Sequence, residues 1–176
     1  MIRFDSVNDN NYKMKNVRHL LIAYKGGVMN AVTGETTFSK AEKESVKKAV
    51  EKLYIEFRTG AMTEEMFAAM ANQFSEDGDG TTGGLCENVF QGQMAKPFED
   101  GCFDPIRRAG DVEMVETEYG WHIIYFVSDT ESTFRDYLVT NEKRLVDLKA
   151  WYEDLLANTK LDLLTDAYVN KDLVIG

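Results

Sequence analysis

Two short apolar runs, at residues 17–24 and 121–127, constrain the fold more than any other feature of this sequence. Both are rich in branched or aromatic residues and shorter than a typical helix, so both are predicted to be buried strands. Each contains one of the chain's two histidines, His19 and His122. Because a buried imidazole needs a hydrogen-bond partner, we expect the histidines either to be satisfied separately in the core or to form a paired network.

Two amphipathic helices are predicted between these strands. Residues 39–42, Ser-Lys-Ala-Glu, have the spacing of a capping box, and apolar residues then recur at helical intervals as far as Gly60. The second helix is predicted to start at Thr63, with acidic residues in its first turn, and to end at Ser75. The segment that follows, residues 76–84, is dominated by glycine and aspartate and is predicted to be a shaped loop.

The rest of the pattern places short strands around one short helix and ends in a helical tail. A strand, a helix and a strand are predicted in turn at residues 85–90, 94–103 and 112–117. This order of elements is typical of an α+β domain. The predicted division is a polar lead-in at 1–11, an α+β domain at 12–130 and a C-terminal helical extension at 131–176.

The charge balance excludes two classes of partner. The chain carries 20 Lys and Arg residues against 30 Asp and Glu residues, a net charge of −10, which argues against nucleic acid and anionic membrane surfaces. No apolar run approaches the ~18 residues of a membrane span, and residues 1–16 are unlike a signal peptide. Direct membrane insertion of this chain is therefore not expected. Its two cysteines leave one disulfide or two free thiols open.

Other catalytic chemistries fit the sequence poorly. His19, His122, Asp77 and a cysteine could in principle form a tetrahedral metal site, but no closely spaced ligand pair is present, so no metal is predicted. The loop that begins at Asp77 lacks the further ligands of a calcium loop and the Gly-Lys-Ser/Thr of a phosphate loop. A plain turn and a functional loop both stay open there. No Gly-x-Ser-x-Gly turn presents a serine nucleophile, and neither cysteine has a histidine near it in sequence.

Several segments, taken together and in order, resemble the parvulin family of peptidyl-prolyl cis/trans isomerases. They are Val-Arg-His-Leu-Leu at 17–21, Phe-Ala-Ala-Met-Ala-Asn-Gln-Phe-Ser-Glu-Asp at 67–77, Gly-Gly at 83–84, Gly-Gln-Met-Ala-Lys-Pro-Phe-Glu-Asp at 92–100, and Val-Glu-Thr-Glu-Tyr-Gly-Trp-His-Ile-Ile at 115–124. The resemblance implies a small antiparallel sheet of about four strands with surrounding helices, a layered α+β arrangement to which the C-terminal helical extension is added. It also implies an isomerase that needs no cofactor.

The resemblance implies a substrate pocket. Met94 and Phe98 would accept the proline ring, while Cys86 stands where the family commonly has leucine. Tyr119 lies in a turn where bacterial members often carry an aromatic residue.

The resemblance also implies a catalytic group. His19 and His122 would be the paired core histidines, Thr117 would supply a hydroxyl linked to them, and Asp77 would face the susceptible amide. These residue types suit the reaction, because rotation about an Xaa-Pro bond crosses a barrier of about 18–20 kcal/mol without breaking a covalent bond. A catalyst has to hold the ring in an apolar slot and favour the twisted amide over both planar forms.

Two departures from the family pattern bear on function. After Gly-Gly the family usually continues Asp-Leu-Gly-aromatic-Phe, whereas this chain reads Leu-Cys-Glu-Asn-Val-Phe at 85–90. That difference favours an alternative function, a catalytically weak or inactive chaperone module with the parvulin shape that binds unfolded chains. Phosphate-directed members carry a basic cluster after the first strand, whereas residues 25–38 contain only Lys25 and also Glu35. Specificity for phosphorylated substrates is therefore not expected.

The expected partners are unfolded or exported polypeptides that contain proline. The C-terminal extension resembles a piece of the secreted foldase lipoproteins of Gram-positive bacteria, which implies an extracellular or cell-surface location and leaves a cytoplasmic one open. Its apolar face could pack on its own domain, on further chaperone segments or on another copy of the chain.

Overall fold

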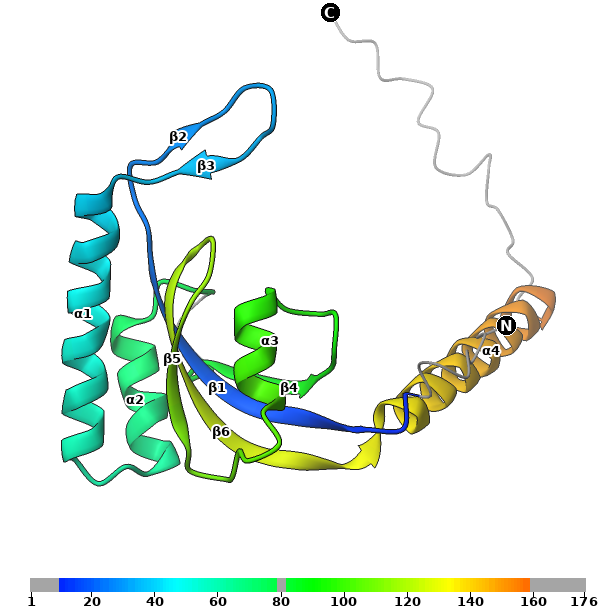
Figure 1. Ribbon diagram of the computed structural model, residues 1–176. Helices are drawn as coiled ribbons and strands as arrows, with labels where there is room; N and C mark the ends of the chain where they lie inside the picture. Colours follow the sequence, from blue (N-terminus) through cyan, green and yellow to red (C-terminus); the bar gives the residue numbers. More distant parts are fainter. Residues whose placement is uncertain (1–9, 79–81, 159–176) are drawn as a thin grey trace, which may run out of the picture. The chain divides into compact units, whose positions relative to one another are not determined.

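A four-stranded antiparallel sheet with the order β4-β1-β6-β5 organises the first of two compact units, residues 1–135 (Figure 1). The structure is a computed structural model that describes residues 10–78 and 82–158. The strands of this sheet are β1 (Lys13–Ala23), β4 (Leu85–Val89), β5 (Val112–Glu116) and β6 (Gly120–Thr133). The helices are α1 (Lys40–Thr59), α2 (Glu64–Phe74), α3 (Lys96–Phe103) and α4 (Phe134–Asn158). The predicted α+β class with a small antiparallel sheet is confirmed.

Both predicted helix starts form as side-chain caps. The Ser39 hydroxyl accepts a hydrogen bond from the Glu42 backbone N–H at 3.1 Å, and the Thr63 hydroxyl accepts one from the Met66 N–H at 3.2 Å. Each bond satisfies an amide that has no partner within its helix. The Glu42 carboxylate accepts from the backbone N–H of Lys25 at 2.8 Å, so it ties the start of α1 to the end of β1.

The sheet carries a separate hydrophobic core on each face. Helices α1 and α2 pack on one face, where Phe57, Phe67 and Ile123 are fully buried, and α3 covers the other face (Figure 1). The α3 face buries Val17, Val89, Phe98, Cys102, Val115, Ile124 and Phe126. The two-residue period of a strand predicts that His19 shares a face with Val17, and both do lie on the α3 side.

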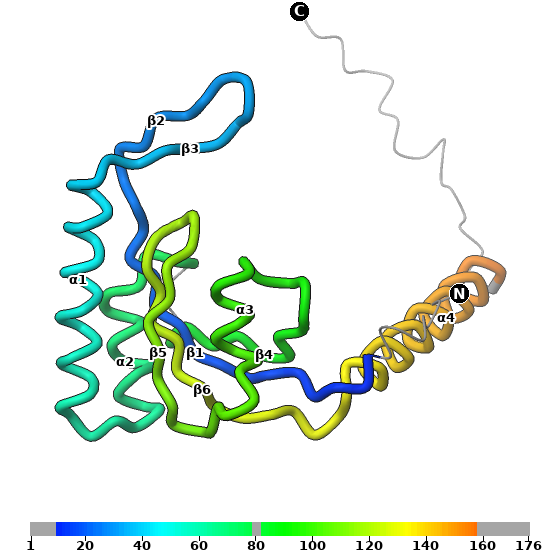
Figure 2. Tube along the Cα trace, viewed as in Figure 1, coloured from blue at the N-terminus to red at the C-terminus, as the bar shows by residue number. Residues whose placement is uncertain are grey.

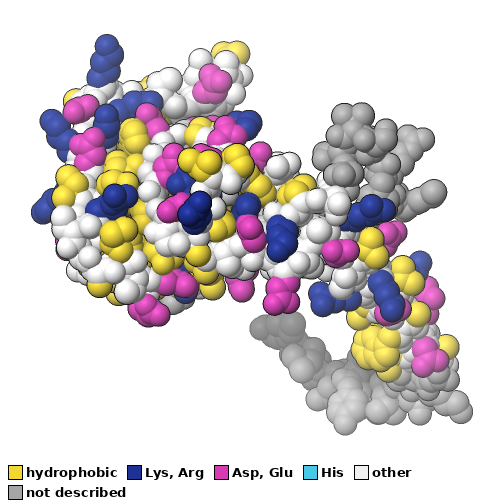
Figure 3. Space-filling view, turned by 60° about the horizontal axis from the view of Figure 1, so that its bottom comes forward, with side chains coloured by type: hydrophobic (Ala, Val, Ile, Leu, Met, Phe, Trp, Pro, Cys, Tyr) yellow, Lys and Arg dark blue, Asp and Glu magenta, His cyan; other side chains and the backbone are white. Residues whose placement is uncertain are grey.

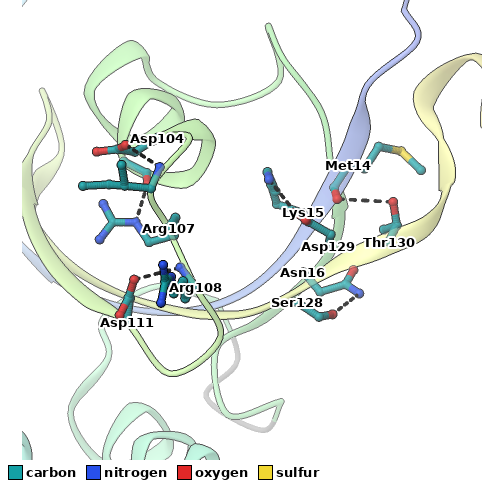
Figure 4. A network of polar contacts seen from close by, with 12 residues as sticks. Met14, Lys15, Asn16, Asp104, Arg107, Arg108, Asp111, Ser128, Asp129 and Thr130 are labelled. Atoms are coloured by element: carbon teal, nitrogen blue, oxygen red, sulfur yellow. Dashed lines mark hydrogen bonds and ion pairs between the residues drawn. The ribbon is translucent and has the colours of Figure 1, made fainter.

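The central strands continue beyond the predicted runs, because their polar ends pair with each other. Lys13 lies opposite Thr133, and Lys15 lies opposite Asp129, with which it forms an ion pair (Figure 4). The Thr130 hydroxyl donates to the Met14 carbonyl at 3.2 Å. Periodicity does not show these residues as strand, because their pairing depends on a partner more than 100 positions away in sequence.

A small hairpin occupies the segment predicted as a loop between the first strand and the first helix. Its strands are β2 (Val28–Met29) and β3 (Thr36–Thr37), and Figure 2 shows it extending beyond the end of β1 and the start of α1, which it connects. Asn30 closes the turn, with its side-chain oxygen accepting from the N–H groups of Val32 and Thr33. Each strand is too short to show an alternating pattern, so the hairpin was not predicted.

The second compact unit, residues 136–176, is described as far as residue 158 and contains most of α4. The predicted helical tail is confirmed there, while the part of the prediction at 161–176 lies outside the described residues. Large apolar side chains of α4 are exposed, including Leu145, Trp151 and Tyr152. Figure 3 shows hydrophobic and charged side chains side by side along this helix. The predicted domain boundary at 130/131 stays a prediction; β6 continues to Thr133.

Candidate active site

One cavity, of about 1020 Å³, collects every site residue that the sequence predicted. These residues, which come from four elements and three loops of the first unit, are His19, Asp77, Cys86, Met94, Phe98, Thr117, Tyr119 and His122. The cavity lies on the α3 face of the sheet, where β1 and β6 run side by side. In this register His122 lies opposite Leu21, two residues along β1 from His19, so both imidazoles project from the same face.

The polar residues of the cavity form one continuous chain of contacts. Thr117 Oγ1 lies 2.9 Å from His122 Nε2, His122 Nδ1 lies 3.4 Å from His19 Nδ1, and His19 Nε2 lies 3.1 Å from Asp77 Oδ2. Both histidines and Thr117 are buried, whereas the Asp77 side chain is half exposed. The paired network is therefore the arrangement present, rather than two histidines satisfied separately.

The direction of the proton donors follows from the two ends of this chain. An ionised Asp77 can only accept, so His19 Nε2 carries its proton and His19 Nδ1 is an acceptor. His122 then donates from Nδ1, and its Nε2 accepts from the Thr117 hydroxyl. The Thr117 oxygen in turn accepts from the backbone N–H of Tyr119 at 3.2 Å. This arrangement satisfies each of these groups with both imidazoles neutral.

Burial keeps the imidazoles neutral. Desolvation, together with the neighbouring His19, lowers the pKa of His122 from 6.5 to about 4, against the opposing effect of Asp77. Desolvation also lowers the pKa of His19, although the Asp77 carboxylate favours the protonated ring. At neutral pH the network therefore orients Asp77 through hydrogen bonds without placing a cation beside it.

An apolar floor lies next to the network. The ring of Phe98, which is 3% exposed, packs edge-on against both imidazoles, with centroid distances of 5.4 Å to His19 and 5.4 Å to His122. Phe98 follows Pro97 in the first turn of α3, a position where proline suits a helix. Met94 and Cys86 line the same cavity. These side chains form the apolar part of the cavity wall beside the polar network.

The segment that carries Asp77 is fixed along β1. The Ser75 hydroxyl accepts from the Leu21 N–H at 3.2 Å, and the Glu76 N–H donates to the Leu21 carbonyl at 2.8 Å. The Glu76 carboxylate accepts from the Ala23 N–H at 2.8 Å and pairs with Lys25. These bonds hold the end of α2 against the strand and so place Asp77 next to His19.

Gly84 makes the closest backbone approach in the site. Its carbonyl accepts from the His19 N–H at 2.8 Å, and a Cβ on Gly84 would lie 1.9 Å from the His19 carbonyl oxygen. Gly84 also has a φ of +68°, which residues other than glycine rarely adopt. Glycine is thus required here if the chain after Asp77 is to return to β1 as β4.

Arg18 holds this glycine turn from the opposite side of the strand. Its guanidinium donates to the carbonyls of Thr82 at 2.9 Å and Gly83 at 3.1 Å, and it pairs with Glu64 at 2.9 Å. The Gly83 N–H donates to the Asn72 side chain at 2.6 Å. No sequence pattern pointed to Arg18, although it directly precedes His19 and must face away from it in a strand.

The unusual stretch after the glycine turn still forms a strand. Cys86 lies opposite Val17 in β1, and the pairing is irregular between Lys15 and Val17, near Asn88 with its φ of 57°. Both cysteines are free thiols, and burial raises the pKa of Cys86 and raises that of Cys102 to about 12. High pKa values make both thiols poor nucleophiles at neutral pH.

A protein site for a metal such as zinc needs three or more ligands that converge on one point. Within residues 10–78 and 82–158, no group of three His, Cys, Asp or Glu side chains converges as metal ligands. His19 and Asp77 point their polar atoms at each other, so these atoms are already occupied.

Several residues of the cavity wall were not predicted. The hairpin supplies the stretch from Thr33 to Phe38, including Glu35, and the turn after β5 supplies Glu118. The place of Glu35 in the wall depends on the path of the hairpin, which its sequence did not reveal. Glu118 reaches the wall with the β5–β6 turn, which also carries Thr117 and Tyr119.

The comparisons with known proteins identify the family and agree with the fold. A family model for the PPIC-type PPIASE domain matches residues 1–131. Chaperone SurA of Hahella chejuensis is 28% identical over 134 residues, 73% of this chain, and Foldase protein PrsA 3 of Bacillus cereus is 35% identical over 111 residues, 58% of this chain. A crystal structure of a PpiC-type peptidyl-prolyl cis-trans isomerase domain has a TM-score of 0.53 at 18% identity, over 70% of this chain and 96% of that one, which shows the fold.

The chain is much shorter than its curated relatives. The alignments cover 29% of the SurA protein and 38% of the PrsA protein, so the chain spans about a third of the length of either.

Proposed function

The chain belongs to the family of PPIC-type peptidyl-prolyl isomerase domains, and on that premise we propose that it accelerates cis/trans rotation about Xaa-Pro bonds in unfolded or exported polypeptides. The observation that carries the proposal is the convergence of an apolar floor and a hydrogen-bonded polar chain in one cavity. Rotation needs both, because the proline ring has to be held while the carbonyl on the other side of the bond turns.

The apolar floor is proposed to hold the ring. Phe98 and Met94 offer apolar surface beside the cavity's polar atoms, and Phe98 is fixed by the two imidazoles on which it packs. A preformed slot holds the ring without further ordering of the protein. Binding then restrains one side of the rotating bond, which favours geometries close to the twisted amide.

Asp77 is proposed to act on the rotating amide. It is the most exposed member of the polar chain, and its carboxylate is oriented by the His19 Nε2–H. Thr117 and His122 are positioning residues, because they act through His19 and fix which of its nitrogens carries the proton. A fixed carboxylate beside the amide favours the twisted form, in which the amide nitrogen loses its conjugation with the carbonyl.

The proposed substrates are not phosphorylated. Glu35, Asp77 and Glu118 line the cavity, and no Lys or Arg stands among its described lining residues. Lys25, the one basic residue of the segment 25–38, forms an ion pair with Glu76. A phosphate group would meet carboxylates without a compensating cation.

The test is exchange NMR on short Xaa-Pro peptides with the wild-type chain and with Asp77→Ala and Met94→Ala, each checked for folding. We expect wild type to raise the cis/trans exchange rate and both folded variants to lose most of the acceleration. A well-folded wild type without acceleration would contradict the proposal and leave a proline-binding chaperone module as the better account.

Unfolded polypeptides are the proposed partners of the whole protein, and the proposed location lies outside the cytoplasm, at the cell surface or beyond. The support is the similarity to proteins named as a chaperone and a foldase. Among the described residues, no helix is long and apolar enough to cross a membrane.

The helical extension is proposed to be a separate element, with the domain at 12–130 and the extension at 131–176. The exposed apolar side chains of α4 support packing on further chaperone segments or on another copy of the chain. Sedimentation at increasing protein concentration tests the second of these, since self-packing raises the average mass.

A further inference from the structure

The charges that line the cavity have one sign. Of the residues that form its wall, Glu35, Asp77 and Glu118 are acidic, and the described part of the wall includes no Lys or Arg. Asp77 is engaged by His19, but neither Glu35 nor Glu118 forms an ion pair with a described residue. The cavity therefore presents two carboxylates whose charge is not compensated.

Glu118 is held beside an aromatic ring. A hydrogen bond between the Glu118 carboxylate and the Tyr119 hydroxyl raises the pKa of Tyr119. Tyr119 is 59% exposed, and both residues line the cavity. A carboxylate next to an exposed ring suits a Lys or Arg side chain, since the cation meets a negative charge and its stem covers the ring.

Glu35 belongs to the hairpin that forms another part of the wall. Its backbone carbonyl accepts from the Asn30 N–H at 2.8 Å, which closes the β2–β3 turn, and its backbone N–H donates to the Thr33 hydroxyl at 3.3 Å. These bonds fix the backbone at Glu35 on the cavity wall.

The nearby cations are neutralised elsewhere. Lys25 pairs with Glu76, and Lys43 pairs with Glu116 at 3.1 Å while lying over the ring of Tyr24. Neither ammonium group belongs to the cavity wall.

We propose that Glu35 and Glu118 are specificity-determining residues, and that the site favours Xaa-Pro segments with a Lys or Arg directly before or after the proline. This inference rests on the proposed isomerase function. Exposed carboxylates act on a nearby cation only modestly, so each is expected to change the preference by about two- to fivefold. The effect decreases with salt, because the Debye length falls from about 10 Å at 0.1 M to about 3 Å at 1 M.

The experiment measures catalysed exchange by NMR for two peptide series, Ala-Xaa-Pro-Phe and Ala-Ala-Pro-Xaa, with Xaa as Lys, Ala or Glu. It compares wild type with Glu35→Gln, Glu118→Gln and Glu131→Gln. Glu131 is an exposed carboxylate of β6 that does not line the cavity, so its variant carries the same change in net charge without a change in the wall.

We expect the Lys peptide to exceed the Glu peptide in catalysed rate in at least one series. The Lys/Glu rate ratio should fall in Glu35→Gln and in Glu118→Gln and at 1 M salt, and it should not change in Glu131→Gln. Equal rates for Lys and Glu peptides in both series would overturn the inference. An equal fall of the Lys/Glu rate ratio in all three variants would also overturn it, because the preference would then come from the net charge of the whole molecule and not from the cavity wall. If no peptide, including the Ala peptides, is accelerated, the isomerase function itself fails.

Discussion

His19 and His122 are the chain's only histidines, so every imidazole titration belongs to the cavity. Because burial lowers both pKa values, the unfolded chain binds more protons than the folded one below about pH 6.5. The folded state therefore loses stability as pH falls from about 6.5 toward 4, where His122 itself titrates. The loss of folding free energy that comes from His122 is on the order of 3–4 kcal/mol, at about 1.4 kcal/mol for each pKa unit between 6.5 and about 4.

Proton NMR of the two imidazole C–H signals measures this directly, alongside urea unfolding at several pH values. Glu76 and Glu116 also have lowered pKa values, caused first by Lys25 and Tyr24 respectively, but their contribution is present above about pH 4.5 and is lost below it. Both imidazoles titrating near 6.5 would contradict the buried neutral pair.

Thr117 gives a second test at the scale of one residue. Valine has nearly the same shape but no hydroxyl, so Thr117→Val leaves the Tyr119 N–H and His122 Nε2 without their partner. We expect a loss of about 1–3 kcal/mol in the free energy of unfolding and a lower rate of catalysed cis/trans exchange in Xaa-Pro peptides. Thr117→Ser keeps the hydroxyl and should recover most of both. A valine variant with wild-type stability would show that this contact contributes nothing.

At the scale of elements, the helices could be predicted because their signals are local. Ser39 and Thr63 cap α1 and α2 as the spacing indicates, and the apolar period ends near where each helix ends. The hairpin at β2 and β3 could not be predicted, since two-residue strands carry no period. The polar start of β1 was missed for a different reason: its partner, the end of β6, is distant in sequence.

The glycine turn before β4 is the element-scale prediction. Gly84 and Gly26 share a φ of +68°, but a Cβ on Gly84 would meet the His19 carbonyl at 1.9 Å, whereas a Cβ on Gly26 meets nothing within 4 Å. Gly26→Ala should therefore lower the free energy of unfolding by about 1 kcal/mol, the cost of a positive φ at an alanine. Gly84→Ala should lower it by about 3 kcal/mol or more, because the added Cβ also collides with β1.

Thermal or urea unfolding of the two variants checks this difference. Similar losses in Gly26→Ala and Gly84→Ala would mean that backbone conformation alone, and not the approach to β1, explains the glycine. The catalysed cis/trans exchange of a peptide gives a second readout. It should fall in Gly84→Ala, because displacing the turn shifts the chain between Asp77 and β4.

At the scale of the whole molecule, the site is assembled from residues that are distant in sequence. Resemblance to the parvulin family pointed to His19, Asp77, Phe98 and His122, and the fold brings them into one cavity. Local pattern could not show that Thr117 and Asp77 stand at opposite ends of one polar chain, because that depends on the β1–β6 register. The place of Glu35 in the wall was not predicted for another reason, because it depends on the β2–β3 hairpin.

A truncation tests whether the first unit works alone. A chain that ends after residue 140 keeps Phe134, whose ring stacks on Phe90 at 4.6 Å, and removes most of α4. Since every described residue of the cavity wall precedes residue 123, we expect the catalysed rate of peptide exchange to stay within about twofold of the full chain, a difference in barrier of about 0.4 kcal/mol. Loss of activity in a truncated chain that unfolds at the same urea concentration would show that the extension contributes to the site.

The most direct test of the central claim combines turnover and binding in one NMR sample. A small amount of folded wild-type chain is added to an Xaa-Pro peptide, and the cis/trans exchange rate is measured together with the imidazole signals of His19 and His122. The proposal predicts faster exchange and a shift of both imidazole signals that saturates with peptide, because the proposed site for the ring, on Phe98, lies beside both imidazoles. Faster exchange with unmoved imidazole signals would place the reaction outside this cavity, and unchanged exchange would contradict catalysis by this chain.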